Sequence, residues 1–424
     1  MHTQHLLVFM NKLSHSVLTR VKRERMEKAS SKPRTYVKIP ASMRLSQSNL
    51  DQFVTQMLPC MKLAMFSKAR NEFVAPIVKC CCSISPKIVL PAVLDIVYPA
   101  LETLTEPHRL LQALQVLVAV APMLAKDQPD KDGKTFRIHA INLMNSLLPG
   151  LDQNDMGKCL TTFQIVGVLV NLIPLVDCSE AIHLRSDLTD DEKELCSATA
   201  NFESIIAMFM DKLLSMMVEY GEAAAFSGSH TNINAKTRAN VDDHILHRGT
   251  ISVFKGICRN SSTELYKVAV DRLYNFLCEH IFDCKTVSTA VSDMVFVAVK
   301  MYPTISFMRF FSLIKKKLEQ CISVETYSEE KVDFQVIWWL SMADRVLKAP
   351  ANHLLENWSA IRQLLELVLP LKKCTLATAK CTAILESVLE GLCSIYLLES
   401  PTRRANADKS LEGNVSDTTL VCND

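Results

Sequence analysis

Apolar residues recur every three or four positions along most of this chain, and this spacing restricts its fold more than any other feature. One example is the series Leu50, Val54, Met57, Met61 and Met65, which would form a stripe along one side of a helix. A strand would instead alternate apolar and polar residues, and no alternating pattern of comparable length occurs in this sequence. The spacing therefore predicts an all-α protein.

Local start and stop signals separate the expected helices. Ser85-Pro86 places a capping residue before a proline at the first helical position. Thr189 and Glu192 have the spacing of a capping box, in which each side chain accepts a hydrogen bond from the other residue's amide. Gly150 is expected to end a helix in the left-handed conformation. Glycine is otherwise scarce, at 10 of 424 residues against roughly 7% in average proteins, which also favours helices.

The order of the expected helices predicts a repeat architecture. Helix pairs recur about every 40–47 residues, as in HEAT and armadillo arrays, and an irregular helical globule is the alternative. A single core stops growing beyond roughly 250–300 residues, so we predict an α-solenoid of HEAT/armadillo-like helix pairs over residues 46–398, with a long loop near 226–240. Residues 1–45 are predicted to form an N-terminal helix and basic linker, and residues 399–424 a disordered polar tail.

Charge and cysteine content exclude several classes of protein. Lys and Arg number 47 and Asp and Glu 45, so the net charge is +2 and no specific nucleic acid partner is predicted. The 15 cysteines include no Cys-x-x-Cys pair, which favours reduced thiols in an intracellular protein over a disulfide framework or a zinc ribbon. No secretory signal is expected, because the N-terminus has only five consecutive apolar residues and lacks a small-residue cleavage site. No membrane partner is expected, because polar residues or proline interrupt the longest apolar runs, 110–125 and 163–176.

Cys278, His280 and Cys284 form the group that most resembles a metal site, because three soft ligands occur close together in the sequence. On a helix, however, residues two positions apart point about 200° away from each other. The three side chains would then not converge on one ion. Buried thiols and a surface histidine are the preferred interpretation.

Asp242, Asp243, His244 and His247 place a His-x-x-His pair beside carboxylates, which would suit a divalent metal or acid–base chemistry. Their expected position is the start of a helix, next to the loop predicted near 226–240. Helix capping by Asp242 explains the cluster more simply, and we prefer that interpretation.

Two further groups are interpreted as core residues, namely three consecutive thiols and a set of aromatic residues at helical spacing. They are Cys80, Cys81 and Cys82, and Phe307, Phe310, Phe311, Trp338 and Trp339. No phosphate-binding loop, dinucleotide-binding turn, nucleophile elbow or zinc-protease helix is present in the sequence. We therefore predict no catalytic, cofactor-binding or metal-binding residue, no cofactor, and no enzyme activity.

Residues 20–34 contain seven basic and two acidic side chains in the sequence RVKRERMEKASSKPR. Such a strip suits a nuclear import signal or contacts to phosphate groups. The alternative is a solvated linker, which we favour because charged linkers of this kind need no ligand.

Several polar segments of the chain resemble the proteasome activator subunit 4 family, whose members are very large HEAT-repeat caps of the core proteasome. The two longest are residues 98–108, YPALETLTEPH, and residues 187–203, DLTDDEKELCSATANFE. Shorter segments that carry the resemblance are residues 7–13, 63–68, 148–155 and 174–179. The resemblance is strong over about residues 5–210, and it is weaker but collinear to about residue 398.

The resemblance implies a non-catalytic activator that works without ATP or ubiquitin. It implies binding to the end ring of the core proteasome, opening of its gate, degradation of peptides and acetylated histones, a link to DNA repair, and a location in the nucleus and cytoplasm. The family's activating C-terminus and acetyl-lysine-binding region have no counterpart here, so the chain is expected to be an internal part of a longer activator that forms dome wall. The alternative function is a helical-repeat adaptor or nuclear transport-receptor-like scaffold that binds an extended protein.

Overall fold

The computed structural model describes residues 2–29, 39–65, 71–102, 107–127, 135–152, 154–226 and 233–394. The regular structure in these ranges is helical, and its only β-type contact is an isolated bridge between Leu175 and Ser261. The prediction of an all-α protein is therefore confirmed. The α-helices are α1 (His2–Ala29), α2 (Gln47–Met65), α3 (Val74–Ile84), α4 (Pro86–Glu102), α5 (Pro107–Ala125), α6 (Arg137–Ser146), α7 (Met156–Leu172), α8 (Ala181–Leu184), α9 (Asp190–Thr199), α10 (Phe202–Phe226), α11 (Ile233–Asn260), α12 (Thr263–Glu279), α13 (Lys285–Met301), α14 (Pro303–Cys321), α15 (Phe334–Val346), α16 (Ala351–Glu356), α17 (Trp358–Val368) and α18 (Thr375–Cys393).

The chain divides into two compact units. The first unit comprises Met1–Met216 and Asn260–Val268, and the second comprises Met217–Arg259 and Ala269–Asp424. The predicted boundaries at residues 45 and 398 differ from this division, and they stay a prediction. Residues 30–38 of the expected linker and all of the expected tail lie outside the described residues.

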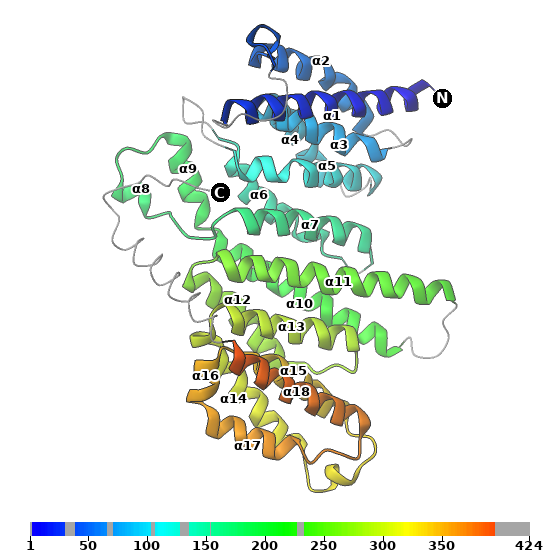
Figure 1. Ribbon diagram of the computed structural model, residues 1–424, viewed down its shortest axis with the longest axis vertical. Coiled ribbons are helices and arrows are strands. Elements are labelled where there is room, and N and C mark those ends of the chain that lie inside the picture. The colour runs from blue at the N-terminus through cyan, green and yellow to red at the C-terminus, as the bar shows by residue number, and fades with distance from the viewer. Residues whose placement is uncertain are drawn as a thin grey trace. The chain divides into compact units, whose positions relative to one another are not determined.

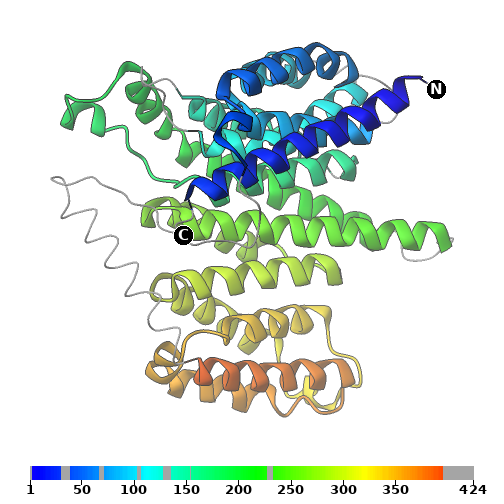
Figure 2. The same cartoon turned by 45° about the horizontal axis from the view of Figure 1, so that its top comes forward.

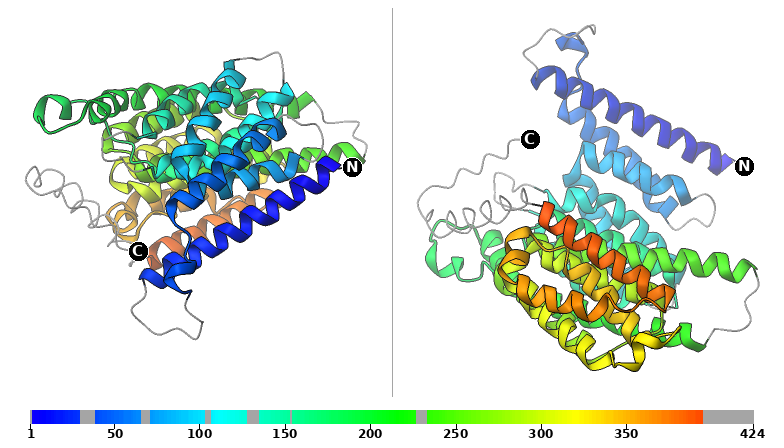
Figure 3. Two further views of the ribbon diagram at one scale, coloured as in Figure 1. Left: turned by 90° about the horizontal axis from the view of Figure 1, so that it is seen from above. Right: turned by 60° about the horizontal axis from the view of Figure 1, so that its bottom comes forward.

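The first unit is a stack of helices in two layers (Figure 1). Helices α1, α3, α5 and α7 form one layer, in which each packs against the next. Helices α2 and α4 form the second layer, with α6 and α9 beyond them, and α4 packs across the layers on α5. The dark blue α1 lies at the edge of this unit, beside α3 (Figure 3). This pairing is what the apolar stripes of successive helices require, since each stripe needs a neighbour to cover it.

The second unit repeats the two-layered arrangement (Figures 1 and 2). Helices α13, α15 and α18 pack side by side in one layer, and α14 packs against α13, α15 and α16 in the other. Helix α12 contacts α14 through the rings of Tyr274 and Phe310, whose centroids are 6.1 Å apart.

The aromatic residues interpreted as core are buried, which confirms that prediction. Trp338 and Trp339 of α15 and the three phenylalanines of α14 are each at most 1% exposed. Full burial of a large apolar side chain contributes roughly 1.5–3 kcal/mol to stability. Burial of these five side chains on α14 and α15, which pack against each other, therefore stabilises the second unit.

The capping box predicted at Thr189 is confirmed: the Glu192 amide donates to Thr189 Oγ1 at 3.3 Å, and the Thr189 amide donates to Glu192 Oε2 at 2.9 Å. Pro86 is the first residue of α4, as predicted. The capping role predicted for Ser85 was wrong, because its hydroxyl donates to Asp51 Oδ1 on α2 at 2.7 Å. The box could be predicted from sequence because its partners lie within four residues of one another, whereas the partner of Ser85 comes from another helix.

Gly150 has a different role from the one predicted. Helix α6 ends at Ser146, and Gly150 is the last residue of a short 3-10 helix rather than a left-handed terminating residue. A Cβ atom at this position would overlap the hydroxyl of Thr162 on α7. Glycine is needed here because its backbone lies directly against the Thr162 side chain, and sequence spacing does not reveal such an approach.

The loop predicted near 226–240 is shorter than expected. Helix α10 extends to Phe226 and α11 begins at Ile233, while residues 227–232 lie outside the described residues. The expectation was wrong for residues 233–240 because a segment without apolar periodicity can still be helical when it extends a packed helix. Its Ala, Lys and Arg residues have good helix propensity.

One described helix is long and apolar enough to cross a membrane by length and composition, namely α5 within the window His108–Ala125. Half of that window is buried inside the protein, and the core helix of a globular fold meets the same criteria. Helix α5 packs against α3, α4 and α7, so its apolar character is explained by packing.

Candidate functional surfaces

The residues Cys278, His280 and Cys284 do not form a metal site. Cys278 is exposed on α12, whereas Cys284 is buried directly before α13. His280 follows the last residue of α12 and is half-buried. Its ring stacks on Phe276 at a centroid distance of 4.9 Å. The interpretation as buried thiols and a surface histidine is therefore confirmed for Cys284 and was wrong for Cys278 and His280. The described residues contain no group of three or more His, Cys, Asp or Glu side chains arranged to hold a metal ion.

The cluster from Asp242 to His247 lies within α11 rather than at its start. Since α11 begins at Ile233, Asp242 cannot cap it, and that interpretation was wrong. Asp243 instead accepts a hydrogen bond of 2.5 Å from the hydroxyl of Tyr220. Burial raises the pKa of Tyr220 well above its usual range, and the Asp243 carboxylate adds a smaller effect in the same direction. The bond joins α10 to α11.

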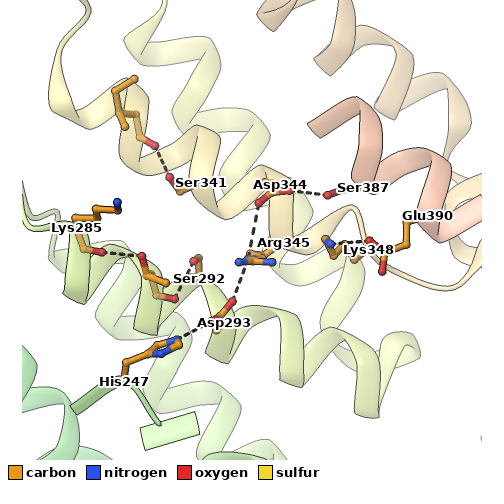
Figure 4. A network of polar contacts seen from close by, with 12 residues as sticks. His247, Lys285, Ser292, Asp293, Ser341, Asp344, Arg345, Lys348, Ser387 and Glu390 are labelled. Carbon is orange, nitrogen blue, oxygen red and sulfur yellow. Dashed lines mark hydrogen bonds and ion pairs between the residues drawn. The ribbon is translucent and has the colours of Figure 1, made fainter. Parts of the chain in front are cut away.

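His247 belongs to a chain of polar contacts that joins four helices of the second unit (Figure 4). Its Nε2 lies 2.8 Å from Asp293 Oδ2 on α13, and Asp293 Oδ1 lies 3.0 Å from Arg345 Nε on α15. Arg345 is also 3.7 Å from Asp344 Oδ2, and the hydroxyl of Ser387 on α18 donates to Asp344 Oδ1 at 2.5 Å. We call these five residues the polar ladder.

The polar ladder is suited to holding helices together. Asp293 and Asp344 are 19% and 14% exposed, so each carboxylate is partly desolvated and needs the partners it has. On α18, burial lowers the pKa of Lys380, and the charge of Asp344 opposes that shift. Both carboxylates are engaged in ion pairs or hydrogen bonds, and the hydroxyl of Ser387 joins α18 to Asp344.

Sequence reasoning did not identify the polar ladder. Its one local signal is a charged residue inside an apolar helical run, such as Asp293 before Met294 and Val295, or Asp344 and Arg345 near the end of α15. A charge at a core-facing position indicates a buried partner, but the sequence does not say which one.

The consecutive thiols Cys80, Cys81 and Cys82 are all buried in α3, which confirms that they are core residues. Burial raises the pKa of Cys81 to about 11 and that of Cys82 to about 12. Thiols with such pKa values are almost entirely protonated at neutral pH, and only the thiolate is a nucleophile or metal ligand. These cysteines therefore act as small apolar side chains.

The basic strip at residues 20–34 is described only as far as Ala29, where α1 ends. Arg20 donates from Nε to Glu24 Oε1 at 3.0 Å and from a second guanidinium nitrogen to the backbone oxygen of Met43. Part of the strip is thus helical, and the interpretation as a solvated linker was wrong for these residues. Its roles in nuclear import and in phosphate contact stay untested.

Comparison with known proteins identifies the family of the chain. The mid HEAT repeats region of proteasome activator complex subunit 4 matches residues 1–417. Proteasome activator complex subunits 4A and 4B of Danio rerio are 32% and 30% identical to it over 92% of its length. Subunit 4 of Homo sapiens is 31% identical over 93%. The chain belongs to the proteasome activator complex subunit 4 family. The predicted family and the predicted α-solenoid of HEAT-like repeats are thereby confirmed.

The chain spans about a fifth of the length of these relatives, 21% in each of the three. The match to a mid region agrees with the expectation that the chain resembles an internal part of the family. The family name describes a regulator of another particle, and the prediction that the chain is not an enzyme is consistent with that name. Among solved structures, an engineered protein aligns over 70% of this chain at 14% identity, but its TM-score of 0.31 carries no argument.

Proposed function

We propose that this chain is a segment of an ATP- and ubiquitin-independent proteasome activator, in which it forms part of the wall of a helical dome over the core proteasome. The observation that carries the proposal is the match of residues 1–417 to the mid HEAT repeats region of the activator family. The layered helices with buried aromatic contacts support a structural role for this segment. In this proposal the end ring of the core proteasome is the partner, and it is contacted by regions outside this chain.

The proposed activator works by binding energy alone. It opens the gate of the core proteasome because it binds the open end ring more tightly than the closed one. Shifting such an equilibrium from 1:99 to 99:1 requires roughly a 10⁴-fold preference. Peptides and, in the full-length family, acetylated histones are the proposed substrates of the opened particle, and the nucleus and cytoplasm are the proposed locations.

The test uses the longest native protein that contains this sequence, purified and mixed with core proteasomes. We expect it to co-purify with core particles and to increase the hydrolysis of a fluorogenic peptide without ATP. The isolated chain of 424 residues is expected to do neither. Failure of the longer protein to associate with core particles would overturn the proposal.

Matched variants of the longer protein test the contribution of this segment. Arg345→Ala removes the central cation of the polar ladder and is expected to reduce stimulation at elevated temperature. Arg362→Ala removes an exposed pair with Glu366 on α17, whose two side chains are 72% and 62% exposed, and is expected to leave stimulation unchanged. Equal effects of the two variants would contradict a structural role for the ladder.

A further inference from the structure

A groove with cationic side chains on both sides lies between α1 and α3 in the first unit. Its volume is about 680 Å³, and its lining includes Lys12, His15 and Lys22 of α1 and Lys79 of α3. All four residues are exposed, and no acidic residue lines the groove. Among the described residues, none of the three lysine ammonium groups has an ion-pair or hydrogen-bond partner.

The cations are spread along the groove and do not surround a single point. Lys12 and Lys22 are ten residues apart on one helix, which corresponds to about 15 Å. With His15 they fall within roughly 80° of the helix circumference, so they occupy one face of α1. Lys79 stands on the opposite wall, at the same end as Lys22, since the charges of both lysines act on the thiol of Cys80.

The groove also has apolar surface between its charges. Leu18 and Cys80 are 8% and 7% exposed and form its floor, and Pro76 is exposed on the wall contributed by α3. A compact phosphate group would gain little from such a floor, because phosphate is held by converging donors and not by apolar contact. An extended ligand with both acidic and apolar groups would use both features.

We propose that the groove between α1 and α3 binds an acidic peptide segment in which carboxylate side chains alternate with apolar ones. An extended peptide rises about 3.3 Å per residue, so roughly five residues cover the distance from Lys12 to Lys22. Alternate side chains of an extended peptide point to opposite sides, which directs carboxylates to the lysines and apolar groups to the floor. Exposed ion pairs are individually weak and screened by salt, so binding is modest in affinity and salt-sensitive.

A second cavity of about 800 Å³ extends the surface beyond the ridge of α1. It shares His15 and Ser16 with the groove and includes Pro40 and the exposed side chain of Met43. The longer surface accommodates peptide residues that continue past His15. Arg20, which also lines this cavity, already bonds to Glu24 and is not assigned to the ligand.

The test measures the binding of short fluorescent peptides to the full chain by fluorescence anisotropy. In one peptide Glu alternates with Leu, and in the other Glu alternates with Ser. In the wild type we expect saturable binding that weakens as salt increases. The triple variant Lys12→Glu, Lys22→Glu and Lys79→Glu is expected to weaken binding about tenfold or more, because three exposed attractions become repulsions. Replacing the peptide's Glu residues with Gln is expected to have a similar effect.

A matched variant controls for net charge. Lys255→Glu, Lys267→Glu and Lys331→Glu also reverse three exposed lysines without partners among the described residues, and we expect binding within about twofold of wild type. Circular dichroism and thermal unfolding check that both variants fold. If the triple Lys→Glu variant at the groove does not fold, a triple Lys→Gln variant at the same positions replaces it in the binding assay.

Three results would overturn the proposal. One is undetectable binding of the acidic peptide at low salt, and another is an equal loss of binding in both triple variants. The third is tighter binding of inorganic polyphosphate than of the peptide, together with equal affinities for the Leu-containing and Ser-containing peptides. That result would assign the groove to phosphate. The assay contains no proteasome, so its outcome is independent of the function proposed above.

Discussion

Replacing Gly391 of α18 with alanine is expected to destabilise the second unit, although alanine is the better helix former. A Cβ atom at this position would lie 2.6 Å from Leu354 Cδ1, 2.7 Å from the backbone oxygen of Ala349 and 2.9 Å from that of Leu347. The leucine methyl can rotate away, but the two carbonyl oxygens belong to the turn after α15 and cannot. The added methyl group must therefore push α18 away from its neighbours.

The expected loss of stability follows from two opposing effects. Gly→Ala in a helix interior gains about 1 kcal/mol in helix propensity. Overpacking of a filled core costs typically 1–3 kcal/mol, and rigid backbone contacts place Gly391 in the upper part of that range. The net destabilisation is about 1–2 kcal/mol, which would lower a urea midpoint by roughly 0.5–1 M.

Tryptophan fluorescence measures this effect in the second unit alone, because all three tryptophans of the chain, Trp338, Trp339 and Trp358, lie there. Gly157→Ala on α7 is the matched control, since a Cβ there meets only Asp155 Oδ1 at an ordinary distance of 3.5 Å. That variant is expected to be neutral or stabilising by up to about 1 kcal/mol. Its unfolding is measured by circular dichroism. A midpoint for Gly391→Ala at or above the wild-type value would refute the reasoning.

Two further predictions concern polar contacts. Arg345→Ala is expected to destabilise the second unit by about 1–2 kcal/mol, because it leaves Asp293 partly buried with only His247 beside it; Arg362→Ala should cost less than about 0.5 kcal/mol in the same urea titration. On α6 of the first unit, burial lowers the pKa of His139, while the charge of Glu194 opposes the shift. The unfolded chain then binds this proton more readily, so the stabilising effect of the neutral ring is complete above about pH 6.5 and is lost as the pH falls below that value. Thermal unfolding of wild type and His139→Gln between pH 7.5 and 5.5 checks this, and the variant should lose part of the pH dependence.

Either polar prediction has a clear contrary result. Equal stability losses for Arg345→Ala and Arg362→Ala would show that the ladder contributes no more than an exposed pair. An unchanged pH dependence in His139→Gln would show that this ring, which lies 2.9 Å from the hydroxyl of Tyr98 through Nδ1, titrates as it does in the unfolded chain.

Several elements could be predicted because their causes are local. The capping box at Thr189 involves partners within four residues, and the proline at the start of α4 marks its own position. Burial of Trp338 and Trp339 followed from their place in an apolar helical run. In each case the chemistry that decides the structure lies within one helical turn or one helix face.

The wrong predictions share a different origin. The start of α11 was misplaced because its first residues have no apolar periodicity and are helical as a continuation of a packed helix. The prediction that Asp242 caps this helix fails for the same reason. The prediction that Gly150 ends a helix fails because the role of Gly150 depends on Thr162, which lies on the following helix.

The sequence by itself determined the helical class, most helix positions, the apolar core and the family, because periodicity, caps and extended polar segments are properties of consecutive residues. Only the tertiary structure decided which polar side chains meet. Asp293 and Arg345 are far apart in the chain, as are Lys22 and Lys79, and their local sequence does not say which residue each of them meets. Their pairing and convergence depend on the stacking of helix layers, which brings together residues separated by one or more helices.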